Sequence, residues 1–522
     1  MKNRSKTFRS LAGSLSIAGL LAVSACSGGA SGGNAPNANL DEGEALVIAD
    51  ETQPLSGLDP IMAQAHDAKR FVAQFYEGLL QLGPDGRTIE PALATKWEQT
   101  SDTEYQFELR EGVTFHDGSE LTAEDVKFSL ERILDPEQNS PYRSLYRISE
   151  VAVEGDDLVT ISLSAPQTSL LRLLAQPWSG GIVDQEWTES RSADDLKTAE
   201  NGTGPYQLDS FQEGSTIKAS AFEDYWDGAP EIRDVEYRVM PDEATRVQAL
   251  RSGAIHMAQV RIPKNQAQLK DGGFSVGEPF HVGTYWLAMN MQGGPLADER
   301  IRKAINLGVD REQLIQIGSQ GAGVLSGVVP PGDPFGTSAE EGLPNYEHDP
   351  EQAKELLKEA GAEDLTLTLA IRAESPEKLA TAQLVKEQLA EIGVTLDIRQ
   401  VEWSRLVSAI LSGEWNADFV QLTAALNADP SQYLDLWFAK GGAATKVKDE
   451  TLWQMMADAV EKASTDEERI EAYAEINRYI ADKAYMLVPY ASVQVYEAWA
   501  PGLEFQVEPS STRLLLKDAS FE

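Results

Sequence analysis

The sequence predicts an α/β protein with at least two domains. Its 522 residues are more than one hydrophobic core usually serves, so the chain is expected to divide. From residue 45 onward, short segments typical of strands are interleaved with segments whose apolar residues recur at helical spacing. Residues 365–401 contain a strand, a helix and a second strand in succession, which indicates parallel strands covered by helices.

The first 44 residues precede this folded part, and residues 1–25 have the composition of a secretory signal peptide. Basic residues are followed by an apolar stretch, residues 11–25, that is shorter than the roughly 20 apolar residues a membrane span needs. Val23-Ser24-Ala25-Cys26 resembles the bacterial lipobox, whose Cys receives a diacylglycerol and becomes the new N-terminus. The alternative is that Cys26 is an incidental small hydrophobic residue. Residues 26–44, rich in Gly, Ser and Asn, are expected to form a flexible tether.

Strand and helix signals in the first half are local. Residues 45–49 are apolar, and residues 105–109 alternate apolar and polar side chains as a half-buried strand does. Thr122, followed three residues later by Asp125, forms a near capping box at the start of a helix.

Element boundaries in the second half are marked by a capping residue and Pro at helix starts, and by Gly at helix ends. Asp349-Pro350 begins one such helix, and Ser375-Pro376 begins the next. These signals predict helices over 350–360 and 376–392, strands over 365–369 and 394–401, and further helices near 452–462 and 467–483.

Composition excludes several classes of function. The 83 acidic and 44 basic residues give a net charge of −39, which argues against a nucleic-acid-binding protein because phosphates would be repelled. One Cys excludes an intrachain disulfide framework or a Cys-rich metal site. Five dispersed His residues leave little material for a histidine metal centre, so neither a metal nor a cofactor is expected.

No catalytic motif stands out in the chain. It lacks a nucleophile elbow, a zinc-protease helix and a P-loop. The spacing of Gly321, Gly323 and Gly327 is one residue too long for a nucleotide loop, so this segment is interpreted as a connection. His116-Asp117 is interpreted as a turn Asp beside a surface His. An exported α/β protein of this kind favours solute capture in a cleft between two lobes that close by hinge motion.

Three segments carry a family resemblance. Leu93-Ala-Thr-Lys-Trp97, residues 105–118 and Leu121-Thr-Ala-Glu-Asp-Val126 resemble the signature of the family 5 extracellular solute-binding proteins. These are the peptide, nickel and opine receptors of ABC importers. Weaker matches, such as Gly202-Thr-Gly-Pro-Tyr206, extend the resemblance over residues 45–522.

The resemblance implies a bilobal, type II periplasmic-binding-protein fold with a hinged cleft. Lobe I would comprise residues 45–78, 190–280 and 488–522, an extra domain would span 79–189, and lobe II would span 281–487. The implied partners are a small-molecule or peptide ligand and an ABC permease with its ATPase. The chain would be a monomer, held by its lipid on the extracytoplasmic face of the cell membrane.

The resemblance also implies ligand contacts. Dipeptide-binding relatives bind the ligand amine with an Asp four residues before the Pro of an Asp-Pro pair. Beside Asp429-Pro430 that position is Leu426, which argues against a free dipeptide because a buried ammonium without a counter-charge is costly. Arg372 matches an Arg that binds the ligand carboxylate, although a surface Arg at a strand end is an equal alternative.

Other matching positions complete the predicted ligand site: Gln64, His66, Asn290, Trp403 and Asn427. Trp403 would line the cleft, although a Trp there is about as often core. Tyr76 and Tyr206 are expected in the core.

We therefore expect a lipid-anchored receptor of an ABC importer that binds an oligopeptide or another amide- or carboxylate-bearing compound. Nickel is less favoured as the ligand, although a metal chelate is an open alternative. One alternative is an extracellular hydrolase with a nucleophile or paired carboxylates of perturbed pKa in its cleft. Another is a receptor that passes a peptide signal to a sensor rather than to a transporter.

Overall fold

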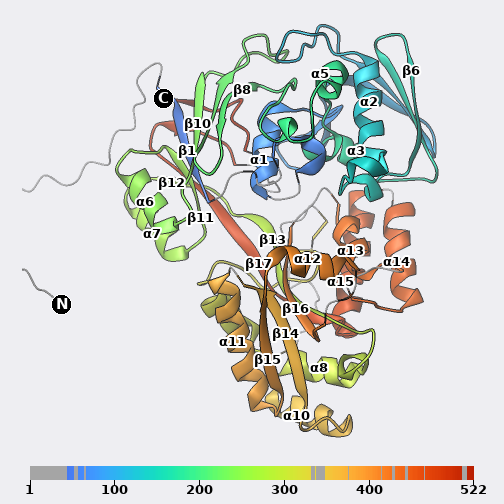
Figure 1. Ribbon diagram of the computed structural model, residues 1–522, viewed down its shortest axis with the longest axis vertical. Helices are drawn as coiled ribbons and strands as arrows, with labels where there is room; N and C mark the ends of the chain where they lie inside the picture. Colours follow the sequence, from blue (N-terminus) through green and yellow to red (C-terminus); the bar gives the residue numbers. More distant parts are fainter. Residues whose placement is uncertain are drawn as a thin grey trace, which may run out of the picture. The chain divides into compact units, whose positions relative to one another are not determined.

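A mixed sheet of 11 strands runs through the protein (Figure 1). The computed structural model describes residues 44–51, 54, 57–63, 66–330, 335–336, 347–373, 375–412, 414, 416–425, 429–440, 445–463, 465–507 and 514–521, within a unit that spans residues 36–522. The strands follow one another across the sheet in the order β15 (Thr395–Val401), β14 (Thr366–Arg372), β16 (Phe419–Ala425), β13 (Phe280–Met289), β17 (Met486–Trp499), β11 (Met257–Val260), β1 (Leu46–Asp50), β10 (Asp234–Val239), β9 (Thr216–Ala221) and β8 (Tyr206–Gln212), and β12 (Ser275–Val276) also pairs with β17.

The large sheet contains two groups of parallel strands. β14 runs parallel to β15 and β16, and β1 runs parallel to β10 and β11. Two antiparallel strands, β13 and β17, lie between the groups. The first part of β17 pairs with β13 and its last four residues pair with β11, so this one strand belongs to both halves of the sheet.

Smaller sheets and helices complete the fold. The strands are β4 (Ala94–Ser101), β5 (Glu104–Leu109), β7 (Leu158–Leu163) and β6 (Ile148–Glu154) in a four-stranded sheet, the pair β2 (Leu80–Leu82) and β3 (Ile89–Pro91), and the pair β18 (Leu503–Glu504) and β19 (Ser520–Phe521). The α-helices are α1 (His66–Phe75), α2 (Ala123–Leu134), α3 (Leu170–Leu174), α4 (Pro177–Gly180), α5 (Gln185–Glu189), α6 (Glu243–Arg251), α7 (Pro263–Asp271), α8 (Glu299–Leu307), α9 (Arg311–Gln313), α10 (Pro350–Glu359), α11 (Pro376–Glu391), α12 (Trp403–Ser412), α13 (Ser431–Phe438), α14 (Glu450–Glu461) and α15 (Asp466–Asp482). Short helices are η1 (Pro60–Met62), η2 (Pro136–Gln138), η3 (Arg143–Leu145), η4 (Asp195–Lys197), η5 (Pro295–Ala297) and the π-helix η6 (Leu314–Gly318).

The locally signalled elements are confirmed. β1, β5, α10, α14 and α15 lie where the sequence predicts them, and β14, α11 and β15 form the predicted β-α-β unit with parallel strands. The near capping box is also present, because the Asp125 carboxylate accepts hydrogen bonds from the backbone N–H and the hydroxyl of Thr122 at 2.9 and 2.7 Å. Asp349 caps α10 by accepting from the N–H of Gln352 over 2.9 Å.

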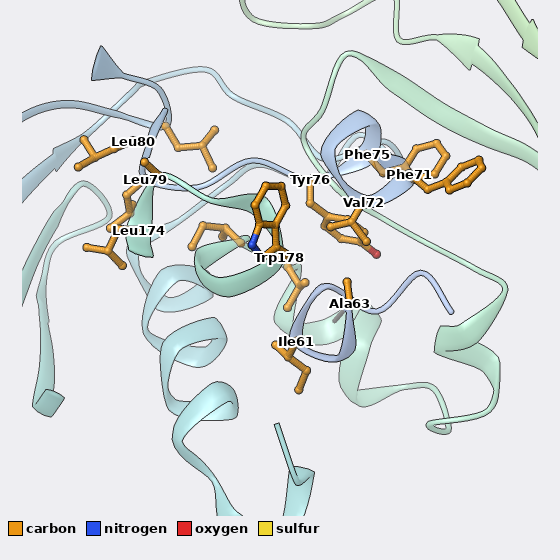
Figure 2. Packing of buried hydrophobic residues seen from close by; sticks show 14 of the residues in the cluster. Ile61, Ala63, Phe71, Val72, Phe75, Tyr76, Leu79, Leu80, Leu174 and Trp178 are labelled. Carbon is orange, nitrogen blue, oxygen red and sulfur yellow. The ribbon is translucent and has the colours of Figure 1, made fainter. Parts of the chain in front are cut away.

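The described residues form separate hydrophobic clusters. The first joins β1, α1 and the four-stranded sheet, and it contains both Tyr76 and Tyr206, as predicted. Figure 2 shows part of it, with Trp178 of α4 among Ile61, Val72 and Tyr76. The second and third clusters lie on opposite faces of β13, since alternate residues of a strand point to opposite sides.

The second cluster contains residues of α8, α10 and α11, and the third contains residues of α12 to α15. A fourth cluster is formed around α6 and β11. The predicted residue bounds of lobe I, lobe II and the extra domain stay a prediction.

Candidate ligand-binding site

The two groups of parallel strands point toward each other. β16 ends at Ala425, whose partner on β13 is Gly283, and Gly283 pairs with Val493 of β17. β11 runs in the opposite direction and ends at Val260, opposite Tyr496 of β17. Val493 and Tyr496 are three residues apart, about 10 Å along a strand.

We call the stretch of β17 between these two residues the junction. Ligands of open α/β sheets bind beyond the carboxyl ends of the strands. Since both parallel groups end at the junction, this is the place where a ligand can contact both halves of the sheet.

Two of the predicted residues lie at the carboxyl ends of β14 and β15. Arg372 is the last residue of β14, half-buried, and pairs in register with Val401, the last residue of β15. Trp403 begins α12 two residues later. The backbone positions of Arg372 and Trp403 are therefore brought together at the carboxyl ends of adjacent parallel strands.

Asn290 lies far from the carboxyl ends of these strands. Its backbone N–H donates to the carbonyl oxygen of Asp418 over 2.9 Å, and its side-chain amide donates to that of Ala417 over 3.4 Å. Both residues precede the start of β16. Asn290 is thus at the amino end of this seven-residue strand, roughly 20 Å from the end that the junction requires.

The other predicted positions are described in part or not at all. For His66 the structure gives its position as the first residue of α1. Gln64, Leu426 and Asn427 lie outside the described residues, as does Cys26.

Asp429, which follows Leu426 and Asn427 in sequence, is a buried residue with several partners. Its side chain is 2% exposed and forms an ion pair with Arg469. It also accepts hydrogen bonds from the Tyr473 hydroxyl over 2.8 Å and from the N–H of Ser431 over 2.9 Å. Sequence reasoning missed Arg469 and Tyr473, although their spacing of four on one helix face was a usable signal.

A second buried charge cluster lies at the carboxyl end of β1. The Arg70 guanidinium lies 3.4 Å from Asp50 Oδ1 and forms an ion pair with Glu497 of β17, which also accepts from the side-chain amide of Gln259 over 3.2 Å. Burial raises the pKa of Glu497, and the positive charge of Arg70 opposes that rise. The cluster joins α1 to β1, β11 and β17 next to the junction.

A cavity of about 490 Å³ also lies close to the junction. Its wall combines Glu51 and Arg261, which follow β1 and β11, with Tyr285 of β13 and Gln320. Tyr285 packs against the second cluster, whereas α12 contributes to the third. The cavity therefore opens on the face of the sheet opposite to α12, and neither Arg372 nor Asn290 is in its wall.

The interpretation of His116-Asp117 is half right. Asp117 is a turn residue that accepts from the N–H and hydroxyl of Ser119 at 3.0 and 2.6 Å. The prediction that His116 lies on the surface is wrong, because its side chain is 5% exposed and its Nδ1 lies 2.7 Å from Glu200 Oε2. Its partner is 84 residues away, so no local pattern could reveal the burial.

Within the described ranges, no helix combines the length and apolar character needed to cross a membrane. In the same ranges no three His, Cys, Asp or Glu side chains gather as metal ligands would.

Comparisons with known proteins identify the family of the chain. The model of the bacterial extracellular solute-binding proteins, family 5 Middle, matches residues 88–445. A probable di/tripeptide-binding protein 5 of Pseudomonas aeruginosa is 30% identical over 434 residues, 77% of this chain and 81% of that protein. The dipeptide-binding protein of Escherichia coli is 28% identical over 486 residues, 86% and 89% of the two chains.

A solved structure shares the fold. The ABC transporter-associated periplasmic binding protein DppA from Helicobacter pylori, in complex with peptide STSA, aligns with a TM-score of 0.77 at 22% identity, covering 92% of this chain and 98% of its own. The bilobal type II binding-protein fold is thereby confirmed, and the chain belongs to the family 5 bacterial extracellular solute-binding proteins of ABC importers.

Proposed function

We propose that this chain captures an oligopeptide, or a related amide- or carboxylate-bearing compound, at the junction and delivers it to an ABC permease. The observation that carries the proposal is the convergence of the ends of β16 and β11 on the four residues of β17 from Val493 to Tyr496. A ligand held there contacts both halves of the sheet at once, so binding favours a closed arrangement that a permease can recognise.

Arg372 is the proposed carboxylate anchor. It stands at the carboxyl end of β14, and a guanidinium there can hold a carboxylate by two parallel hydrogen bonds. Relatives named for di- and tripeptides support a peptide as the ligand class. Leu426, at the position of an amine-binding Asp, favours a ligand other than a free dipeptide.

The proposed place of action is the extracytoplasmic face of the cell membrane. There a monomer would be tethered through lipid on Cys26 and residues 26–44. The tether would let the folded part reach the permease without a membrane-spanning helix of its own.

The hydrolase alternative calls for accessible paired carboxylates, and Asp50 and Glu497 are a carboxylate pair at the junction. Their side chains are only 6% and 2% exposed, and both face Arg70. A substrate would have to displace this ion-pair cluster to reach them. This burial favours a structural role and supports capture over hydrolysis.

The test is identification of what the protein carries. The chain is purified without denaturation, bound small molecules are released by acid and identified by mass spectrometry, and the compound is titrated back by calorimetry. We expect a peptide or carboxylate compound that binds one to one. Recovery of no compound, together with no heat from alanine tri- to pentapeptides, would contradict the proposal.

A further inference from the structure

Side chains outside the candidate site connect the first and third hydrophobic clusters. Arg147 Nη1, just before β6, lies 3.1 Å from Glu461 Oε1 at the end of α14. The Thr168 hydroxyl, just before α3, donates to the carbonyl oxygen of Val460 over 3.0 Å. The second contact joins residues 292 apart in sequence, so these contacts join the two parts of the fold that are built on the first and third clusters.

A buried aromatic ring adds to this connection. Phe335, 1% exposed, lies between two guanidinium groups, with Arg172 Cζ 4.8 Å and Arg469 Cζ 4.2 Å from its centroid. Arg172 belongs to α3 and donates to the carbonyl oxygens of Gly86 and Arg87, each over 3.1 Å. Cations stacked on a ring face are attracted to it, and burial strengthens the attraction.

The stack leads to the candidate ligand site. Arg469 pairs with Asp429, which follows the segment containing Leu426 and Asn427. A continuous line of contacts therefore runs from Arg172 through Phe335 and Arg469 to Asp429. The contacts between the first and third clusters and the Asp429 side chain therefore share one buried group of residues.

We propose that Arg147, Thr168, Arg172, Phe335, Val460 and Glu461 form a latch that holds the receptor closed and thereby sets its affinity. The inference rests on the proposed function, because it concerns the closing of the receptor over its solute. The apparent affinity for a ligand is proportional to the fraction of protein in the binding-competent state, so it falls when that fraction falls. The latch residues determine affinity by stabilising that state, and the ligand is held by other groups.

The test uses the full chain carrying Cys26→Ser and three variants of it: Arg147→Gln, Thr168→Val and Phe335→Leu. Arg147→Gln and Thr168→Val remove polar contacts of partly exposed side chains, so the fold is retained. Phe335→Leu keeps apolar bulk in the core and removes the ring face. Arg233→Gln is the matched control, since it breaks an exposed 2.6 Å ion pair with Glu223 within one half of the protein.

Hydrogen exchange of the ligand-free protein is the first readout. We expect roughly three- to tenfold faster exchange in peptides covering residues 166–174 and 455–463 of the three variants, and no change in the control. The second readout is binding of alanine tri- to pentapeptides. There the dissociation constant should rise roughly three- to tenfold, through a faster dissociation rate.

The outcomes separate the latch from the function. Unchanged exchange in Arg147→Gln and Thr168→Val overturns the latch, as does faster exchange with an unchanged dissociation constant. If exchange is faster in the variants but the parent chain binds none of the peptides, the proposed function is overturned. The result then supports only a contact that joins the parts built on the first and third clusters.

Discussion

His116 Nδ1 lies 2.7 Å from Glu200 Oε2, and the surrounding hydrogen bonds favour the imidazolium form of His116. His116 Nε2 is 2.9 Å from the carbonyl oxygen of Gly204, which can only accept. Glu200 accepts from the backbone N–H groups of Gly202 and Leu208 at 3.0 and 2.8 Å. Burial lowers the pKa of His116, but the Glu200 charge and these hydrogen bonds outweigh burial and raise it overall.

This pair predicts a fall in stability with rising pH. The folded chain holds the His116 proton more tightly than the unfolded chain, whose pKa is about 6.5. The stabilisation is therefore complete below about pH 6.5 and is lost as pH rises through the raised folded pKa. Urea unfolding of the natural protein and of His116→Gln should differ most at pH 6 and progressively less toward pH 9.

Glu77 also acts on His116, and burial raises its own pKa, so it contributes in the same direction. The difference between the two proteins isolates the imidazole from that background. His348→Gln, at an exposed position, is the control and should track the natural protein. A difference that does not vary with pH would contradict the imidazolium.

A second prediction concerns Gly202, which lies against the backbone at the C-terminal end of α1. A Cβ atom at this position would lie 1.9 Å from the carbonyl oxygen of Phe75, so the chain would have to move. Gly202→Ala should lower the free energy of unfolding by about 3 kcal/mol or more, because backbone cannot be displaced cheaply. Gly293→Ala, where a Cβ meets no atom within 4 Å, should change it by about 0.5 kcal/mol at most.

The Asp429–Arg469 pair gives a third prediction. Arg469→Met leaves a buried carboxylate without its counter-charge, which costs about 3–5 kcal/mol. Arg478→Met, on an exposed position of the same helix, should stay within about 0.5 kcal/mol. Equilibrium unfolding in urea measures both, and equal losses would show that the pair is not the cause.

Arg372 is tested through binding. A charge-assisted hydrogen bond contributes about 1.5–3 kcal/mol, so Arg372→Ala should weaken binding of a carboxylate ligand roughly 10- to 150-fold. Arg399→Ala, on the neighbouring strand and exposed, removes the same charge away from the strand end and should leave affinity unchanged. Calorimetry with the recovered ligand compares them, and unaltered affinity in Arg372→Ala would remove it from the site.

The lipid anchor is tested by labelling. Cells expressing the full chain are grown with radioactive palmitate, and the immunoprecipitated protein is examined for label. Cys26→Ser should abolish labelling, because the chain has one Cys. Label that survives the substitution would show that the anchor assignment is wrong.

The elements that could be predicted from sequence are those with local signals. Asp349 and Asp125 bind backbone or hydroxyl groups within three residues, so their caps are visible in the linear pattern. The β-α-β unit is contiguous and was predicted for the same reason. The path of β17 was not predictable, because its partners β11 and β13 lie more than 190 residues earlier in the chain.

The candidate site divides in the same way. Arg372 ends one strand of the contiguous β-α-β unit and Trp403 follows the other. Their common position at the carboxyl ends of the strands could therefore be predicted from the sequence. The role of Asp429 depends on Arg469 and Tyr473, 40 and 44 residues away, and the burial of His116 depends on Glu200. Such long-range pairs are decided by packing, which leaves no periodic trace.

The position of β17 has a consequence for biosynthesis. Neither half of the large sheet is complete until residues 486–499 have been made, since this strand hydrogen-bonds to both. Pairing over such long sequence separations is slow. The large sheet of a nascent chain therefore stays incomplete while most of the chain is being synthesised. A stop codon anywhere upstream of β17 would leave two exposed strand edges and a product prone to aggregate.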